Sequence, residues 1–225
     1  MEHALQADVY ARSPRGNQYY WEDLKSAAPY HLLILAVSDD AIASLSAQLP
    51  PHQDTLVVHT SGVHNADTIS SQHPRRGVLY PLMSFSESAP VSTYRVPYCV
   101  ETSQSGDEKL LRSFLQYLGG QFFSVEPEQK PYLHLAAVLS QNFSNHLFHL
   151  AQELLQKQQL SFQLLMPLLK SSLERVEKYN PQEVQTGPAV RGDQKTIEKH
   201  LSLLPDEDTR KLYRAITQSI QKHHE

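Results

Sequence analysis

Segments typical of β-strands are confined to the first 125 residues of this 225-residue chain, and this asymmetry most constrains its fold. Short strand-like segments alternate there with helical ones, and from Pro131 onward the pattern is helical throughout. The longest apolar run, His31–Val37, is typical of a strand buried on both faces of a parallel sheet. The pattern predicts an open α/β sheet followed by an all-helical domain.

The change in pattern near Pro127 predicts two domains, over residues 1–127 and 128–225. The expected strands cover residues 7–11, 31–37, 55–59, 77–80, 98–101 and 121–125. The expected helices cover residues 41–49, 107–118, 131–157, 160–179, 193–204 and 205–224, with Gly119 and Gly120 as a C-cap of the second. Pro167 predicts a kink or a break inside the fourth helix.

Composition and charge exclude several classes of protein. Hydrophobic residues make up 40% of the chain and charged residues 20%, which excludes a disordered chain. The net charge is −4 and lysine and arginine form no long run, so we expect no nucleic-acid or membrane partner. The single cysteine, Cys99, cannot form an internal disulfide, and no signal peptide is recognisable. We therefore expect a cytoplasmic protein.

Glycine is scarce, and this bears on nucleotide binding. The chain has eight glycines, and none belongs to a G-x-G-x-x-G or G-x-x-x-x-G-K-[ST] motif. Taken alone, the lack of a phosphate-cradling loop argues against a nucleotide enzyme.

Polar residues follow several expected strands, where doubly wound sheets bind ligands. Arg12 and Ser13 follow the first strand, and they could hold a 2′-phosphate or simply be solvated. Ser38 and Asp39 follow the next strand and predict an N-cap for the following helix, a position that also favours anions. The third strand is followed by Thr60, Ser61 and Gly62, a hydroxyl-rich loop suited to a substrate or a nicotinamide.

The expected helix over residues 131–157 carries a polar stripe. At 3.6 residues per turn, His134, Gln141 and Asn145 fall within about 40° of one another, with Asn142 one step round. Such a stripe is either a cleft wall that binds a substrate or a polar network between helices or subunits. The remaining histidines lack the spacing of a zinc motif, so we expect no metal site.

A turn near the C-terminus joins a cation and an acid just before an expected helix. Asp193 is a candidate N-cap, and Arg191 could pair with it or with an acidic group of a substrate.

Together, several segments resemble one protein family. They are VYARS, LAVSDDAI, VVHTSG, VLYPLMSFS, LHLAAVLSQNFSNHL, LLMPLL, QTGPAVRGD and TIEKHL. The family consists of NADP-dependent oxidoreductases with a Rossmann-like N-terminal domain and a helical C-terminal domain of uncharacterised function. It is related to pyrroline-5-carboxylate reductase, deazaflavin-dependent NADP oxidoreductases and 6-phosphogluconate dehydrogenase. The resemblance runs from about Ala7 to Ile220.

The resemblance implies hydride transfer between NADP(H) and a small polar substrate, and a homodimer formed through the helical domain. The residues it implies for the cofactor are Arg12, Ser13, Val37, Ser38, Asp39, Thr60 and Ser61. The residues it implies for catalysis are His134, Asn142 and Asn145. His134 is the first candidate for a general acid, because the reference pKa of histidine is near neutrality.

The chain departs from the family pattern in three places. The family's first strand and glycine-rich turn should precede ADVYARS, so we expect a Rossmann-like domain without its first βα unit. Met83 stands where a polar amide is usual, and Ser140-Gln141 stands where small and asparagine or cysteine residues are more familiar. The alternative to an enzyme is a non-catalytic dimeric binding or structural protein, that is, a degenerate dehydrogenase.

Overall fold

A computed structural model describes residues 6–27, 29–85 and 95–224 of the chain. Ser86, the last residue of the VLYPLMSFS segment, lies outside the described residues. The chain divides into two compact units, residues 1–141 and 142–225, and each is described by itself. The first unit contains every strand of the described chain and also the first helical residues after residue 127. The expected boundary at residue 127 marks the end of the strand pattern.

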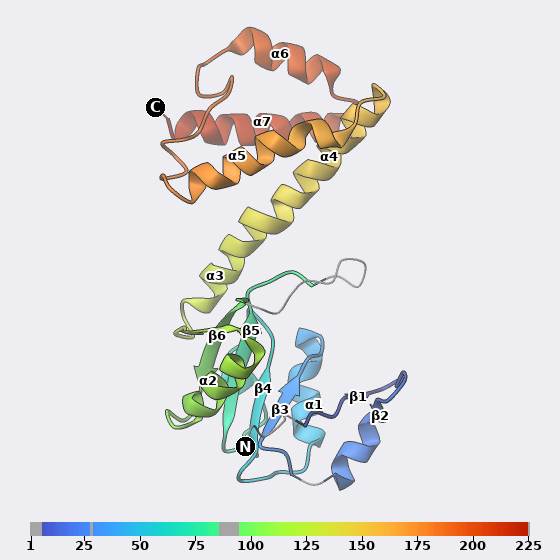
Figure 1. Ribbon diagram of the computed structural model, residues 1–225. Coiled ribbons are helices and arrows are strands. Elements are labelled where there is room, and N and C mark those ends of the chain that lie inside the picture. The colour runs from blue at the N-terminus through green and yellow to red at the C-terminus, as the bar shows by residue number, and fades with distance from the viewer. Residues whose placement is uncertain (1–5, 28, 86–94, 225) are drawn as a thin grey trace. The chain divides into compact units, whose positions relative to one another are not determined.

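The first unit is built on a five-stranded sheet with the order β3-β4-β5-β6-β7 (Figure 1). The strands are β3 (Leu32–Leu35), β4 (Leu56–His59), β5 (Arg76–Pro81), β6 (Pro97–Thr102) and β7 (Gln121–Ser124). Neighbouring strands are parallel except for β5 and β6, which are antiparallel. The expected strands over these residues are confirmed.

Two further strands, β1 (Tyr10–Ala11) and β2 (Tyr19–Tyr20), pair in parallel in a separate two-stranded sheet. β3 is therefore an edge strand of the larger sheet, with β4 as its neighbour. The prediction that the run His31–Val37 is buried on both faces is wrong, because Ile34 is 37% exposed and Val37 is 38% exposed. β2 was not expected, since two residues are too few to show a period-2 pattern.

Successive residues of β4 face opposite sides of the sheet, as strand geometry requires, and join two separate cores. Leu56 and Val58 belong to a core that includes Leu111 and Leu115 of helix α2 (Asp107–Leu118). Val57 belongs to the core on the other face, which includes residues of helix α1 (Ile42–Gln48) and of a 3₁₀ helix, Trp21–Ser26. The sheet is thus covered on both faces, as expected for an α/β domain.

The two helices of this unit test the predicted caps. α2 ends at Gly119, whose φ of 73° is the left-handed conformation that glycine adopts most easily, so the predicted C-cap is confirmed. The N-cap prediction at Ser38 and Asp39 is wrong, because neither side chain accepts a capping hydrogen bond. A 3₁₀ turn, Asp39–Ala41, comes between Ser38 and α1, which begins only at Ile42.

The expected single helix over residues 131–157 is formed by three consecutive segments. They are α3 (Lys130–Ala137), a π-helical segment (Val138–Asn142) and α4 (Phe143–Lys157). The division between the two units falls inside the π-helical segment.

The described residues of the second unit form helices joined by turns, and no strands, as expected. Besides α4 it contains α5 (Met166–Val176), α6 (Gln194–Leu203) and α7 (Glu207–Lys222). Pro167 is the second residue of α5 and so marks a break between helices. Asp193 caps α6 as predicted, since its carboxylate accepts a hydrogen bond from the Thr196 amide at 3.1 Å. Among the described residues, no helix is long and apolar enough to cross a membrane.

Candidate functional site

The parallel strands of the first unit bring three polar segments to one edge of the sheet. Leu35 pairs with His59, so the carboxyl ends of β3 and β4 coincide, and His59 pairs with Val78 of the parallel strand β5, which continues in the same direction to Pro81. The residues that follow them include Ser38, Thr60 and Ser61, and Tyr80 lies at the end of β5. This edge is where open α/β sheets bind their ligands.

The loop after β4 is held by a buried histidine. His59 is fully buried, and its Nδ1 accepts a hydrogen bond from the Ser61 amide at 3.2 Å. Its Nε2 therefore carries the hydrogen and donates to the Asn65 carbonyl at 3.0 Å. Burial lowers the pKa of His59 and favours the neutral ring that both bonds require.

The two hydroxyls of this loop differ in their partners. Ser61 Oγ accepts hydrogen bonds from the amides of Val63 and His64, at 3.2 and 3.1 Å. Within the described residues, the Thr60 hydroxyl makes no hydrogen bond, and Thr60 is half-buried. Ser61 thus shapes the loop, while the Thr60 hydroxyl is free to bind a ligand.

A buried ion pair joins the same loop to α3. Lys130, the first residue of α3, is 1% exposed and its Nζ lies 2.7 Å from Glu101 Oε2 on β6. Lys130 Nζ also donates to the His64 carbonyl, and Glu101 Oε1 accepts from the Ala66 amide at 2.8 Å. The start of α3 is therefore tied to the loop. Sequence reasoning missed this pair, whose only signal was a carboxylate at the end of an otherwise apolar strand.

Two aromatic side chains meet above Gly62. Tyr80 Oη lies 3.2 Å from His134 Nδ1, and the ring centroids are 6.0 Å apart. A Cβ atom at Gly62 would lie 2.7 Å from His134 Nδ1 and from Tyr80 Cζ, so only glycine fits without displacing the pair. Burial raises the pKa of Tyr80, with a smaller contribution from Cys99. His134, the first candidate for a general acid, thus lies beside the loop that carries Thr60 and Ser61, and Tyr80 was missed.

The polar stripe does not follow the straight α-helix assumed for it. Gln141 lies in the π-helical segment, where i→i+5 bonds place more residues in a turn, so the 40° angular spread of the stripe does not apply. Its Oε1 accepts a hydrogen bond from Ser84 Oγ at 3.0 Å. Asn142 and Asn145 belong to the second unit and are exposed. π-Helical turns occur frequently at functional sites.

Apart from Thr60 and Ser61, the residues expected to bind the cofactor are exposed to solvent. Arg12 and Ser13 follow β1 and are exposed, and within the described residues the Arg12 side chain makes no ion pair or hydrogen bond. Val37, Ser38 and Asp39 are exposed as well. A guanidinium without a protein partner fits a phosphate group. The chain contains no glycine-rich turn for a pyrophosphate.

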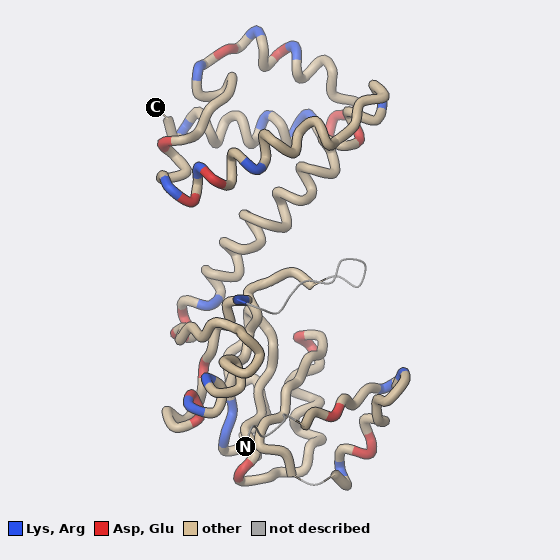
Figure 2. Tube along the Cα trace, viewed as in Figure 1, with Lys and Arg blue, Asp and Glu red and all other residues tan. Residues whose placement is uncertain are grey.

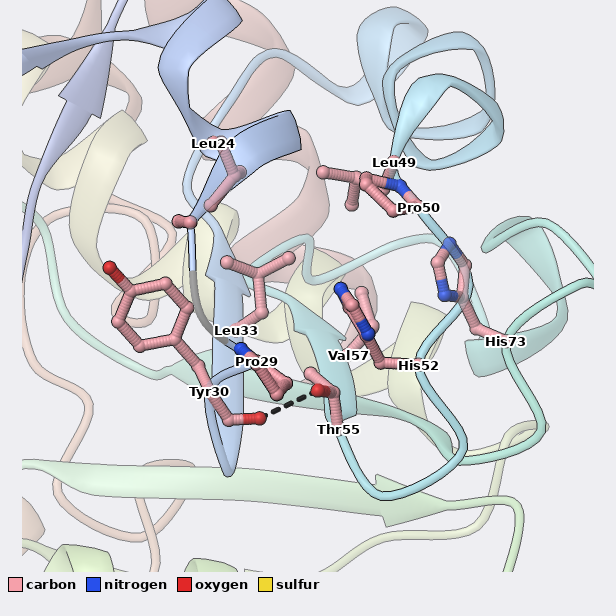
Figure 3. Close-up of a pocket in the computed structure, with 11 residues that line it drawn as sticks. Leu24, Pro29, Tyr30, Leu33, Leu49, Pro50, His52, Thr55, Val57 and His73 are labelled. Atoms are coloured by element: carbon pink, nitrogen blue, oxygen red, sulfur yellow. Dashed lines mark hydrogen bonds between the residues drawn. The ribbon is translucent and has the colours of Figure 1, made fainter.

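A small cavity lies at the opposite end of the sheet (Figure 3). Its volume is about 20 Å³, and Tyr30 and Thr55, which line it, precede β3 and β4. The Thr55 hydroxyl donates to the Tyr30 carbonyl at 2.6 Å across one side of it. The cavity has room for about one water, far below the roughly 300 Å³ of a small-molecule site. It is therefore not the cofactor site.

The histidines of the second unit have ordinary partners. His200 Nδ1 lies 2.8 Å from Tyr213 Oη, and His149 Nε2 lies 3.5 Å from Glu153. Across the described part of the chain, no three histidine, cysteine, aspartate or glutamate side chains are grouped to hold a metal ion.

The sheet, its ligand edge and the helical part that follows define a Rossmann-like protein. The chain belongs to the family described as a domain of unknown function (DUF2520), whose model matches residues 96–220. No curated protein matches the sequence.

Solved structures that are similar to the chain include the following three. A Bacteroides fragilis protein, provisionally described as an NADP oxidoreductase, is 31% identical with a TM-score of 0.84, covering 96% of this chain and 88% of its own. Protein TM1727 from Thermotoga maritima is 21% identical with a TM-score of 0.68, and the match covers 96% of this chain and 89% of that protein. Pyrroline carboxylate reductase from Plasmodium falciparum, solved with NADP bound, is 14% identical with a TM-score of 0.60, covering 96% and 88%. The latter two show the fold alone.

Proposed function

We propose that this protein is an NADP-dependent oxidoreductase that transfers hydride between NADP(H) and a small polar substrate. The observation that carries the proposal is the edge of the sheet where Thr60, Gly62, Tyr80 and His134 meet. The similarity to the Bacteroides fragilis protein, provisionally described as an NADP oxidoreductase, supports it.

Two groups of residues suit the two ends of the cofactor. The Arg12 guanidinium would pair with a 2′-phosphate, with the Ser13 hydroxyl beside it, and Val37, Ser38 and Asp39 would lie along the cofactor. Thr60 and Ser61 would lie at the nicotinamide, where the free Thr60 hydroxyl can donate or accept a hydrogen bond. When bound, the nicotinamide supplies or accepts the hydride, and the protein supplies position and hydrogen bonds.

The substrate would be held by the polar side chains that begin on α3. His134 would donate a hydrogen bond or a proton to it, and Asn142 and Asn145 are the further candidates for catalysis that the resemblance implies.

The test is the change in melting temperature on adding nucleotide to the full chain. Binding to the folded state stabilises it by RT ln(1 + [L]/Kd), about 2.7 kcal/mol at a hundredfold excess over Kd. We expect NADPH to raise the melting temperature more than NADH does. The Arg12→Gln variant should lose this difference, and the Arg15→Gln variant, a nearby exposed arginine, should keep it. No shift with millimolar NADPH contradicts the proposal.

The second unit supports a further part of the proposal, a homodimer formed through its helices. α4 carries only two charged residues, Glu153 and Lys157, and little charge is seen along it (Figure 2). Leu168 and Leu173 of α5 are 58% and 65% exposed. An apolar surface of this kind is typical of an interface, and a second copy of the chain carries the same surface. Sedimentation should give a dimer, and Leu168→Asp with Leu173→Asp should give a monomer.

One observation favours a non-catalytic dimer as the second candidate. The eight glycines form no phosphate-binding motif, so the chain offers a pyrophosphate no cradle of the usual kind. A stable dimer whose melting temperature ignores both nucleotides would support this candidate.

A further inference from the structure

The contact between Tyr80 and His134 selects one ring nitrogen of the histidine. Tyr80 Oη lies 3.2 Å from Nδ1, while Nε2 makes no hydrogen bond with any described residue. Gly62 packs against both partners, at distances that leave no room for a Cβ atom. The two side chains come from β5 and α3, 54 residues apart, and the loop after β4 holds them together. Nε2 is therefore the ring nitrogen left for a ligand.

A protonated tyrosine hydroxyl can donate to Nδ1 or accept from it, so the contact alone allows both directions of this hydrogen bond. A neutral imidazole has one nitrogen that donates and one that accepts, and the hydrogen bond at one nitrogen sets the role of the other. The Tyr80 hydroxyl keeps its proton, since burial raises its pKa. A tyrosine hydroxyl that donates to Nδ1 leaves the hydrogen of the neutral ring on Nε2.

We propose that Tyr80 is a positioning residue that fixes the tautomer of His134, so that Nε2–H is the donor presented to the substrate. That a substrate binds here rests on the proposed function, whereas the tautomer of His134 does not depend on any ligand. A preorganised donor of this kind stabilises negative charge that develops on a substrate oxygen or nitrogen. His134 then presents Nε2–H to the substrate as a hydrogen-bond donor.

The test is nitrogen NMR of the full chain labelled with ¹⁵N-histidine, without nucleotide, with the His134 signals assigned by their loss in His134→Gln. We expect the pattern of a bare Nδ1 and a protonated Nε2 in the native protein. In Tyr80→Phe both signals should move toward those of a mixture of tautomers. Tyr98→Phe, which removes the hydroxyl of another buried tyrosine, should leave them unchanged. A proton on Nδ1 in the native protein, or signals unchanged in Tyr80→Phe, overturns the proposal.

A second variant guards against a folding defect in Tyr80→Phe. Gly62→Ala should displace the pair and give the same movement of the His134 signals. Gly106→Ala, where an added Cβ meets nothing within 4 Å, should not. His134 signals that stay unchanged in a folded Gly62→Ala protein also overturn the proposal.

The readout separates this proposal from the proposed function. The tautomer is measured without cofactor, so a native chain that ignores NADPH defeats only the oxidoreductase. If the native chain binds NADPH, Tyr80→Phe should bind it equally well and lose only kcat. A loss of NADPH binding in Tyr80→Phe would assign Tyr80 to the cofactor and contradict a positioning role.

Discussion

The two units of the molecule differ in how far they bury their apolar and charged side chains. The first unit buries apolar residues on both faces of its sheet and pairs its buried charges, Lys130 with Glu101 and Asp107 with Arg75. In the described part of the second unit, the buried apolar side chains are Ala189, Ile197 and Leu204, whereas large apolar residues of α4 and α5 are exposed. The first unit is therefore stabilised from within, and the second has apolar surface that a partner would cover.

The largest expected effect is the loss of the buried ion pair. Lys130→Met leaves Glu101, whose side chain is 12% exposed, without a counter-charge, and we expect the free energy of unfolding to fall by about 3–5 kcal/mol. Denaturant unfolding measures it.

The matched control lies in the second unit. Lys211 and Asp208 form an ion pair at 3.2 Å on the exposed face of α7, and Lys211→Met should change stability little. Equal losses in the two variants would contradict the contrast between the units.

The next effect is the loss of packing. Leu56 is fully buried, and Leu56→Ala should lower the free energy of unfolding by about 2–5 kcal/mol. Leu164, which is 66% exposed in the second unit, should tolerate the same change within about 0.5 kcal/mol. A comparable loss at Leu164 in denaturant unfolding would show that this surface is covered in solution.

A pH effect should arise in the first unit, at His59. Because burial lowers the pKa of His59 in the folded protein, the unfolded chain binds its proton first as the pH falls below about 6.5. The stabilisation is therefore present above that pH and is lost as the pH falls toward 5. Each unit by which folding lowers the pKa contributes about 1.4 kcal/mol to the free energy of unfolding.

His59→Gln should flatten the decline of unfolding free energy between pH 7 and pH 5. His31→Gln, a change at an exposed histidine, should leave the decline as it is. A His31→Gln protein that flattens it equally would place the pH effect elsewhere.

The smallest effect compares two helix starts. Asp193 accepts hydrogen bonds from the amide and hydroxyl of Thr196, so Asp193→Ala should lower the melting temperature of the second unit by less than Leu56→Ala lowers that of the first. Ser38 makes no capping bond, and Ser38→Ala should leave the melting temperature unchanged. A loss in Ser38→Ala would mean that its hydroxyl caps α1 in solution.

The sequence by itself determined most of the secondary structure and the class of fold. Apolar runs and helical periodicity are local properties, so the five strands of the main sheet, the break at Pro167 and the caps at Gly119 and Asp193 could be read from neighbouring residues. The assignments of cofactor-binding and catalytic residues remain predictions. Of the three residues predicted for catalysis, the structure places His134 beside the loop that carries Thr60 and Ser61.

Tertiary structure alone decided the contacts between distant residues. The composition of β3 does not show that it is an edge strand, because that depends on the order of the strands in the sheet. The pairs Lys130–Glu101 and Tyr80–His134 join residues 29 and 54 positions apart, and no local pattern marks such partners. A buried charge or ring nitrogen is costly without a hydrogen-bond or ionic partner. The sequence shows which residues require such a partner, and the tertiary structure determines which residue it is.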